Sequence, residues 1–190
     1  MDSHVSEAPL RAVEGGGLAP DGDGWFIVNV ADARAYSNER YGDRCRFEGS
    51  SRFSDFGLNV HVVRPGQPAS LYHREEVQEA FLVLSGSCLA IVEEQERQLV
   101  AGDLLHAPAG TAHVLVGTGD TPCVILMIGG RKPLKDPFYP VSDLAAKYGA
   151  SVEREVDSLA AAYAGSKSEP PTLGPIAPWA ESADAATPMI

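Results

Sequence analysis

Histidines and carboxylates gather in the middle of this 190-residue chain. Four of its five histidines lie between residues 61 and 113, namely His61, His73, His106 and His113. Glu75 and Glu79 stand among them. Imidazoles and carboxylates bind divalent metals and transfer protons, so this segment is where chemistry is expected. An isolated histidine on a strand is more often a packed or surface residue than a ligand, and we expect no site role for His61 or His4.

The elements that position these residues are short apolar runs separated by Gly, Pro and acidic turns. Such runs, three to seven residues long at this spacing, are typical of strands in a sandwich or barrel. The predicted strands are residues 58–64, 80–84, 88–92, 98–100, 104–107, 113–116 and 123–128. We therefore predict an all-β domain.

The segments that flank these strands differ in composition. Residues 1–24 are rich in Gly, Ala, Pro and Asp, which predicts a flexible N-terminal arm. The aromatic and β-branched run at residues 25–30 predicts the first strand of a barrel domain over residues 25–130. A helical extension is expected over residues 131–165, followed by a Pro-rich tail at residues 166–190.

Two short helices are predicted within that extension. Residues 141–148 and 155–164 carry Ala and Leu at helical spacing, and Gly149 and Gly165 follow them as candidate residues for the left-handed turn after a helix. We expect both helices to pack on the outside of the barrel.

The bulk composition excludes some classes of partner. The chain has 15 Lys and Arg against 26 Asp and Glu, a net charge of −11, and no basic patch, so nucleic acid is not an expected partner. The first ten residues lack the features of a leader peptide, and the longest apolar run, residues 124–128, is far shorter than a membrane span. We expect a soluble cytoplasmic protein with no membrane partner.

The three cysteines point to the same compartment. Cys45, Cys88 and Cys123 are odd in number, widely spaced and set among apolar neighbours. They are predicted to be reduced, packed thiols of a cytoplasmic protein. A thiolate metal site is the competing interpretation, and no C-x-x-C pair supports it.

The segment from residue 102 to residue 113 has an ordered set of Gly, Pro and His. Gly102 is followed after five residues by Pro108, then by Gly110 and His113. This order resembles the second conserved motif of the cupin family, G-x5-P-x-G-x2-H-x3-N. One position departs from that motif, because Gly117 stands where the family has Asn.

The end of the first cupin motif, G-x5-H-x-H-x(3,4)-E-x6-G, is also matched, because Glu79 is followed after six residues by Gly86. Its beginning departs. Five residues after Gly66 stand Tyr72 and Arg74 in place of the two histidines, and arginine cannot bind a metal because it stays protonated. A frame shifted by one residue gives His73-x-Glu75-x3-Glu79, which we prefer on chemical grounds.

The resemblance, which covers residues 58–130, implies a single cupin double-stranded β-helix, or jelly-roll barrel, with a metal inside it. His73, Glu79 and His113 are then the expected ligands of one divalent metal, Fe, Mn, Zn or Ni. Glu75 is the candidate catalytic residue, either as a base beside the metal or as a further ligand. His106 remains open as a fourth ligand or as a residue behind the ligands.

Two classes of function follow from the resemblance. The first is a metal-dependent enzyme, an oxygenase or isomerase, that acts on a small organic molecule in a cavity lined by Tyr72, Phe81 and Val83. The second is a non-catalytic cupin that binds or senses a small molecule. A homodimer is expected by analogy with the family, formed by exchange of residues 25–30 or of the C-terminal tail around Trp179.

Overall fold

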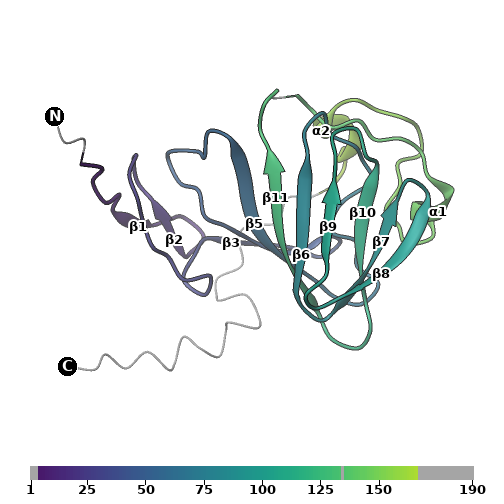
Figure 1. Ribbon diagram of the computed structural model, residues 1–190, viewed down its shortest axis with the longest axis horizontal. Helices are drawn as coiled ribbons and strands as arrows, with labels where there is room; N and C mark the ends of the chain where they lie inside the picture. Colours follow the sequence, from purple (N-terminus) through teal and green to yellow (C-terminus); the bar gives the residue numbers. More distant parts are fainter. Residues whose placement is uncertain (1–3, 134, 167–190) are drawn as a thin grey trace.

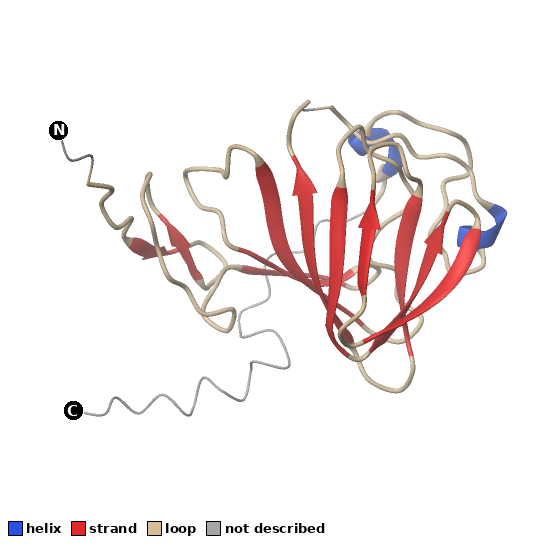
Figure 2. Ribbon diagram, in the orientation of Figure 1, coloured by secondary structure: helices blue, strands red, loops and turns tan. Residues whose placement is uncertain are grey.

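The computed structural model describes residues 4–133 and 135–166. It is mostly β-structure, and Figure 2 shows antiparallel strands with two short helices. The strands, in chain order, are β1 (Leu10–Ala12), β2 (Leu18–Pro20), β3 (Ala35–Asn38), β4 (Gly42–Arg46), β5 (Phe56–Val63), β6 (Glu79–Ser85), β7 (Ser87–Val92), β8 (Gln95–Val100), β9 (Leu104–Ala107), β10 (His113–Thr118) and β11 (Cys123–Gly130). The all-β prediction is confirmed.

Two sheets form the barrel (Figure 1). The larger has the order β3-β4-β5-β11-β6-β9, and the smaller has the order β10-β7-β8. The seven strands predicted between residues 58 and 128 correspond to β5 through β11, with ends that differ by up to three residues. The short apolar runs between Gly, Pro and acidic turns therefore sufficed to find them.

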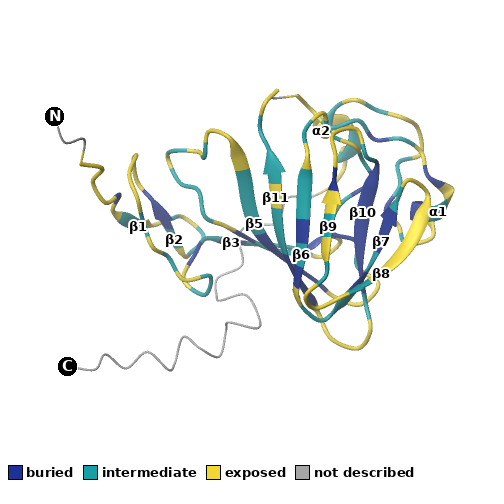
Figure 3. Cartoon of the chain, viewed as in Figure 1, coloured by how far each residue is buried: buried dark blue, intermediate teal, exposed yellow. Residues whose placement is uncertain are grey.

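The interior of the barrel is closed by apolar side chains from both sheets. Every second residue of β5, β6 and β11 points inward, so Val63, Val83 and Ile125 meet Leu115 of β10 in one buried cluster. Figure 3 shows that β10 and β7 are largely buried, whereas β8 is exposed. The packed end of the barrel fixes the strands whose other ends carry the candidate site.

The outer face of the larger sheet is covered as well. Val60, Val62 and Val124 form a buried cluster there with Ala33 and Ala35, against which residues 28 and 30 pack. The prediction of a strand at residues 25–30 is wrong. This segment pairs with another segment at a single position, an isolated bridge between Trp25 and Glu7. Its apolar side chains cover the sheet without joining it.

The first strands of the barrel are instead β3 and β4, which the sequence analysis did not predict. They pair with each other around a turn and extend the larger sheet next to β5. The segment expected to be a flexible arm contains β1 and β2, which pair in a separate two-stranded sheet beside the barrel (Figure 1).

Helices α1 (Asp143–Ala146) and α2 (Leu159–Ala162) lie on the outside of the barrel, at the right and top of Figure 1. Each begins at a serine, Ser142 or Ser158, whose side chain accepts a hydrogen bond from the backbone N–H three residues ahead. Gly149 and Gly165 take positive φ values of 67° and 85°, as expected. Residues 167–190, which include Trp179 and most of the predicted Pro-rich tail, lie outside the described residues.

Candidate metal centre

Glu79 is placed by the start of β6. It pairs across the sheet with Ala107 of β9 and Gly129 of β11, and it shares the inward face of β6 with Phe81. Its carboxylate is 14% exposed. The two-residue period of the strand therefore points this carboxylate into the barrel.

His113 is the first residue of β10 and follows a tight Pro-Gly turn. Gly110 has φ of +85°, a left-handed conformation that other residues adopt at a cost, and its N–H donates to the Glu75 carbonyl at 2.7 Å. The turn sends the chain back into the barrel, where His113 is 1% exposed.

His73 is held directly against His113. Their backbones exchange two hydrogen bonds, of 3.1 Å and 2.8 Å, and their ring centroids lie 4.9 Å apart. On its other side the His73 ring contacts the buried ring of Tyr139, at 5.7 Å between centroids. Residues 73 and 74 form isolated bridges and are not part of a longer strand. The bridge between His73 and His113 is enough to hold the two residues side by side.

Of residues 72 to 74, His73 is the one whose side chain lines the central cavity. Tyr72 is packed on the outer side of the smaller sheet, where its hydroxyl accepts a hydrogen bond from the Glu94 N–H at 3.2 Å. Arg74 extends over the ring of Phe138. Neither side chain lines the central cavity, so the expectation that Tyr72 lines it is wrong.

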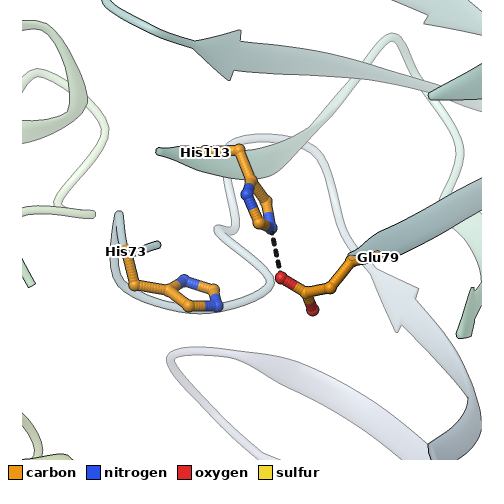
Figure 4. A group of neighbouring side chains, drawn as sticks. All are labelled: His73, Glu79 and His113. Atoms are coloured by element: carbon orange, nitrogen blue, oxygen red, sulfur yellow. Dashed lines mark ion pairs between the residues drawn. The ribbon is translucent and has the colours of Figure 1, made fainter. Parts of the chain in front are cut away.

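The three predicted ligands converge in space. Figure 4 shows His73, Glu79 and His113 pointing toward one another from three separate segments. One ligand atom of each lies within 4.8 Å of the others, and His113 Nε2 is 3.3 Å from Glu79 Oε2. These residues could hold a metal ion.

The hydrogen bonds of the two imidazoles suit that role. His73 Nδ1 lies 2.7 Å from the Leu71 carbonyl, and His113 Nδ1 lies 3.0 Å from the Thr111 carbonyl. A carbonyl oxygen accepts and does not donate, so each Nδ1 carries the proton and each Nε2 presents a lone pair. His113 Nε2 is buried with no hydrogen-bond partner among the described residues, which is the orphaned atom expected of a metal ligand.

Burial keeps these groups uncharged in the absence of a cation. Burial, with a smaller contribution from His113, lowers the pKa of His73 to about 3, and burial also lowers the pKa of His113. Burial and the nearby Glu75 raise the pKa of Glu79 to about 8. A divalent cation at this point would reverse the preference of the carboxyl group, because its charge favours the carboxylate.

Glu75 and His106 have different surroundings. Glu75 lines the same cavity, with Oε1 3.9 Å from His73 Nε2, and burial raises the pKa of its carboxyl group. His106 is exposed on β9 and its Nε2 lies 3.3 Å from the side-chain oxygen of Gln78. The structure thus places Glu75 beside the candidate centre and His106 outside it.

A cavity of about 610 Å³ opens in front of the candidate centre. Apolar side chains of Phe81, Leu115 and Met127 form part of its wall, while Val83 lies deeper in the packed core. The volume is that of a site for a small organic molecule.

Sequence reasoning missed three polar residues of this cavity. Asn59 and His61 lie on the inward face of β5, and Arg44 of β4 stands opposite His61 in register. His61 was expected to be packed or on the surface, and it is buried, with Nε2 2.9 Å from the Tyr41 carbonyl. The two-residue period of β5 could have revealed Asn59 and His61, because it places Gly57, Asn59, His61 and Val63 on the same face of the strand.

Two further observations concern the cysteines and the helices. Cys45, Cys88 and Cys123 are free and buried, as predicted for packed thiols. In the described part of the chain, no helix has the length and apolar character needed to cross a membrane.

Part of the chain is similar to known proteins. Residues 59–129 match the family model described as cupin domain. No curated protein sequence matches the chain. A putative sugar phosphate isomerase from Acidithiobacillus ferrooxidans is 28% identical over 44% of this chain and 54% of that chain, with a TM-score of 0.41. A cupin-superfamily sugar phosphate isomerase from Silicibacter pomeroyi is 29% identical over 50% and 62%, with a TM-score of 0.45.

A protein with a double-stranded β-helix domain from Klebsiella pneumoniae is also similar, at 23% identity over 42% of this chain and 66% of that chain, with a TM-score of 0.40. The chain thus spans between 54% and 66% of the length of these three structures. The matched residues 59–129 include β6 with Glu79 and β10 with His113. Residues 59–129 of this protein are therefore similar to a cupin domain, and the antiparallel sheets of these residues agree with that match.

Proposed function

We propose that this protein is a metal-dependent enzyme that acts on a small organic molecule. In this proposal His73, Glu79 and His113 hold one divalent metal, Fe, Mn, Zn or Ni, and Glu75 is the general acid and base. The observation that carries it is the convergence of two Nε2 lone pairs and one carboxylate on the wall of a cavity that contains a second carboxylate.

The residues around the centre support a reaction by proton transfer. A bound divalent metal would supply Lewis-acid polarisation of a ligand oxygen. Burial raises the pKa of Glu75, which makes its carboxylate a stronger base that can accept a proton from the substrate and return it to another atom. Phe81, Leu115 and Met127 form an apolar part of the cavity wall around that step. Of the oxygenase and isomerase classes, this arrangement favours an isomerase, because proton transfer needs such a base.

The test is turnover by the Glu75→Gln variant. Full-length protein loaded with each of the four metals is assayed against small hydroxyketones, keto acids, phenols and thiols, by NMR of the products and by oxygen consumption. We expect isomerisation by the wild type and a loss of about a hundredfold or more in Glu75→Gln at unchanged metal content.

Glu76→Gln is the matched control, since Glu76 is exposed and pairs with Lys135. Equal turnover in Glu75→Gln and wild type contradicts the assigned role of Glu75. Oxygen consumption by the iron-loaded protein would favour an oxygenase. Ligand binding without turnover under every metal would instead favour a non-catalytic binding or sensing protein.

A further inference from the structure

A second cavity adjoins the one in front of the candidate metal centre. Each has a volume of about 610 Å³, and Arg44, His61, Ala69 and Ser70 line both. Tyr163 and the start of α2 border the second cavity on the far side. A molecule bound in the first cavity can therefore extend past His61 into the second.

The wall of the second cavity is positively charged in a chain of net charge −11. Arg44 and Arg46 line it, and no Asp or Glu does so among the described residues. Asp43, which stands between these arginines in sequence, ion-pairs with Arg64 at 2.8 Å. The charge of the two guanidinium groups is thus left without a carboxylate partner in the part of the chain that the structure describes.

Arg44 is less exposed to water than a typical surface arginine, as is common for residues that bind anions. It is half-buried, and burial together with the nearby charge of Arg46 lowers its pKa from the usual value. Arg46 is exposed, so the cost falls on Arg44, because a guanidinium group that is partly removed from water beside a like charge costs free energy unless an anion compensates it. A bound anion would remove that cost.

Arg46 is held by an aromatic ring. Its guanidinium lies 5.3 Å from the centroid of Tyr36, and the guanidinium of Arg34 lies 4.8 Å from the same ring. Stacking limits the rotamers that Arg46 explores, so less conformational entropy is lost when its fork of N–H donors binds an anion.

The register of the larger sheet relates these arginines to the candidate metal centre. Arg46 stands opposite Asn59, and Arg44 opposite His61. The Asn59 side-chain oxygen is buried without a hydrogen-bond partner among the described residues, and Asn59 lines the first cavity. β4 is three strands from β6, which is about 14 Å along the sheet before curvature and the length of the arginine side chain shorten the gap.

We infer that Arg44 and Arg46 form an anion-binding subsite that holds a carboxylate or phosphate group of the same small molecule that the metal centre binds at its other end. Asn59, between the two, accepts a hydrogen bond from a hydroxyl of that molecule. The substrate class is therefore a small hydroxylated anion. The inference deepens the proposed function and depends on it for the metal-bound end of the molecule.

The experiment measures binding of simple anions to full-length protein after treatment with a chelator. Inorganic phosphate and acetate are titrated separately at pH 7.5, with ³¹P or ¹³C line broadening as the readout. We expect at least one anion to bind to wild type and its Kd to rise about tenfold or more in Arg44→Gln and in Arg46→Gln. Arg44→Lys, which keeps the charge, should lose less affinity than Arg44→Gln.

Two controls separate this inference from the metal centre. Arg97→Gln removes an exposed arginine of β8, whose guanidinium hydrogen-bonds to the Glu96 carbonyl and the Gln95 side chain, and it should leave binding unchanged. His113→Ala should bind the anion as wild type does, even if it no longer binds metal.

The anion that binds more tightly identifies the charged group of the substrate. The inference is overturned if neither anion binds, if Arg97→Gln weakens binding as much as the two cavity variants, or if binding disappears in His113→Ala. The last result would place the anion at the metal centre instead.

Discussion

At the scale of single residues, the candidate centre is defined by the hydrogen bonds behind it. The backbone carbonyls of Leu71 and Thr111 hold the Nδ1 protons of His73 and His113, which leaves both Nε2 atoms as acceptors. Neither imidazole therefore needs to lose a proton when a metal binds. Glu79 does, because its pKa is raised to about 8.

Metal binding is consequently expected to release protons. At pH 7 the carboxyl group of metal-free Glu79 is mostly protonated, so binding should release close to one proton per chain. Metal affinity should rise from pH 6 to pH 8 and then level off. The raised pKa also means that Glu79 stabilises the metal-free fold fully below its unfolded pKa of about 4.5, and that this contribution is lost as the pH rises through about 8.

Titration calorimetry in buffers of different ionisation enthalpy measures the released protons. Glu79→Gln should abolish the release and weaken metal binding, whereas Glu76→Gln, a change at an exposed glutamate, should alter neither. Metal binding by wild type with no proton released at pH 7 would show that Glu79 is ionised before the metal arrives.

The ligand residues could be predicted from the sequence to the extent that their spacing is local. Glu79 and His113 each lie at a fixed distance from a turn glycine, Gly86 and Gly110. His73 could be chosen over Tyr72 and Arg74 by chemistry, because arginine has no lone pair to offer. The residues of the second cavity could not be found, because Arg44 reaches His61 through sheet pairing between β4 and β5, which spacing does not reveal.

At the scale of elements, strands with apolar runs were predictable and those with mixed composition were not. Apolar runs mark β5, β6, β7, β10 and β11, whereas β3 and β4 contain Ser, Asn, Asp and Arg. The reverse error arose at residues 25–30, whose apolar residues bury against Val60 and Val62 without pairing as a strand.

Alanine substitutions at Gly110 and Gly117 should destabilise the fold to different extents. A Cβ at Gly110 would meet nothing within 4 Å, so Gly110→Ala should cost about 1–2 kcal/mol from its φ of +85° alone. A Cβ at Gly117 would lie 2.2 Å from the Arg64 carbonyl oxygen, a collision with backbone. Gly117→Ala should therefore destabilise the fold more than Gly110→Ala.

Urea unfolding of both variants and of wild type tests this order. Gly117→Asn, which restores the residue typical of the family, should be at least as damaging as Gly117→Ala. A Gly117→Asn variant as stable as wild type would mean that Arg64 and β10 can move apart without cost.

At the scale of the whole molecule, we propose a homodimer, which exposed apolar side chains near the N-terminus support. Trp25 is 48% exposed and Ile27 79% exposed, in the segment that we expect to exchange between subunits. Light scattering should then give twice the chain mass of 20.1 kDa.

Ile27→Asp is expected to shift this dimer toward monomer. Leu104→Asp is the matched control, because Leu104 is also exposed, at 64%, but lies on the opposite edge strand of the larger sheet, β9. A monomeric wild type would contradict the homodimer. Dissociation by Leu104→Asp alone would move the interface to β9.

The central claim is that His73, Glu79 and His113 bind a divalent metal, and the metal content of the purified protein tests it most directly. The protein is prepared without added metal and measured by inductively coupled plasma mass spectrometry, beside His73→Ala, Glu79→Ala and His113→Ala. His106→Ala is the control, because that histidine is exposed outside the cavity. We predict about one divalent metal per chain in wild type and His106→Ala, and about a tenth of that or less in the other three variants. A wild type with no more metal than these three variants would contradict the account.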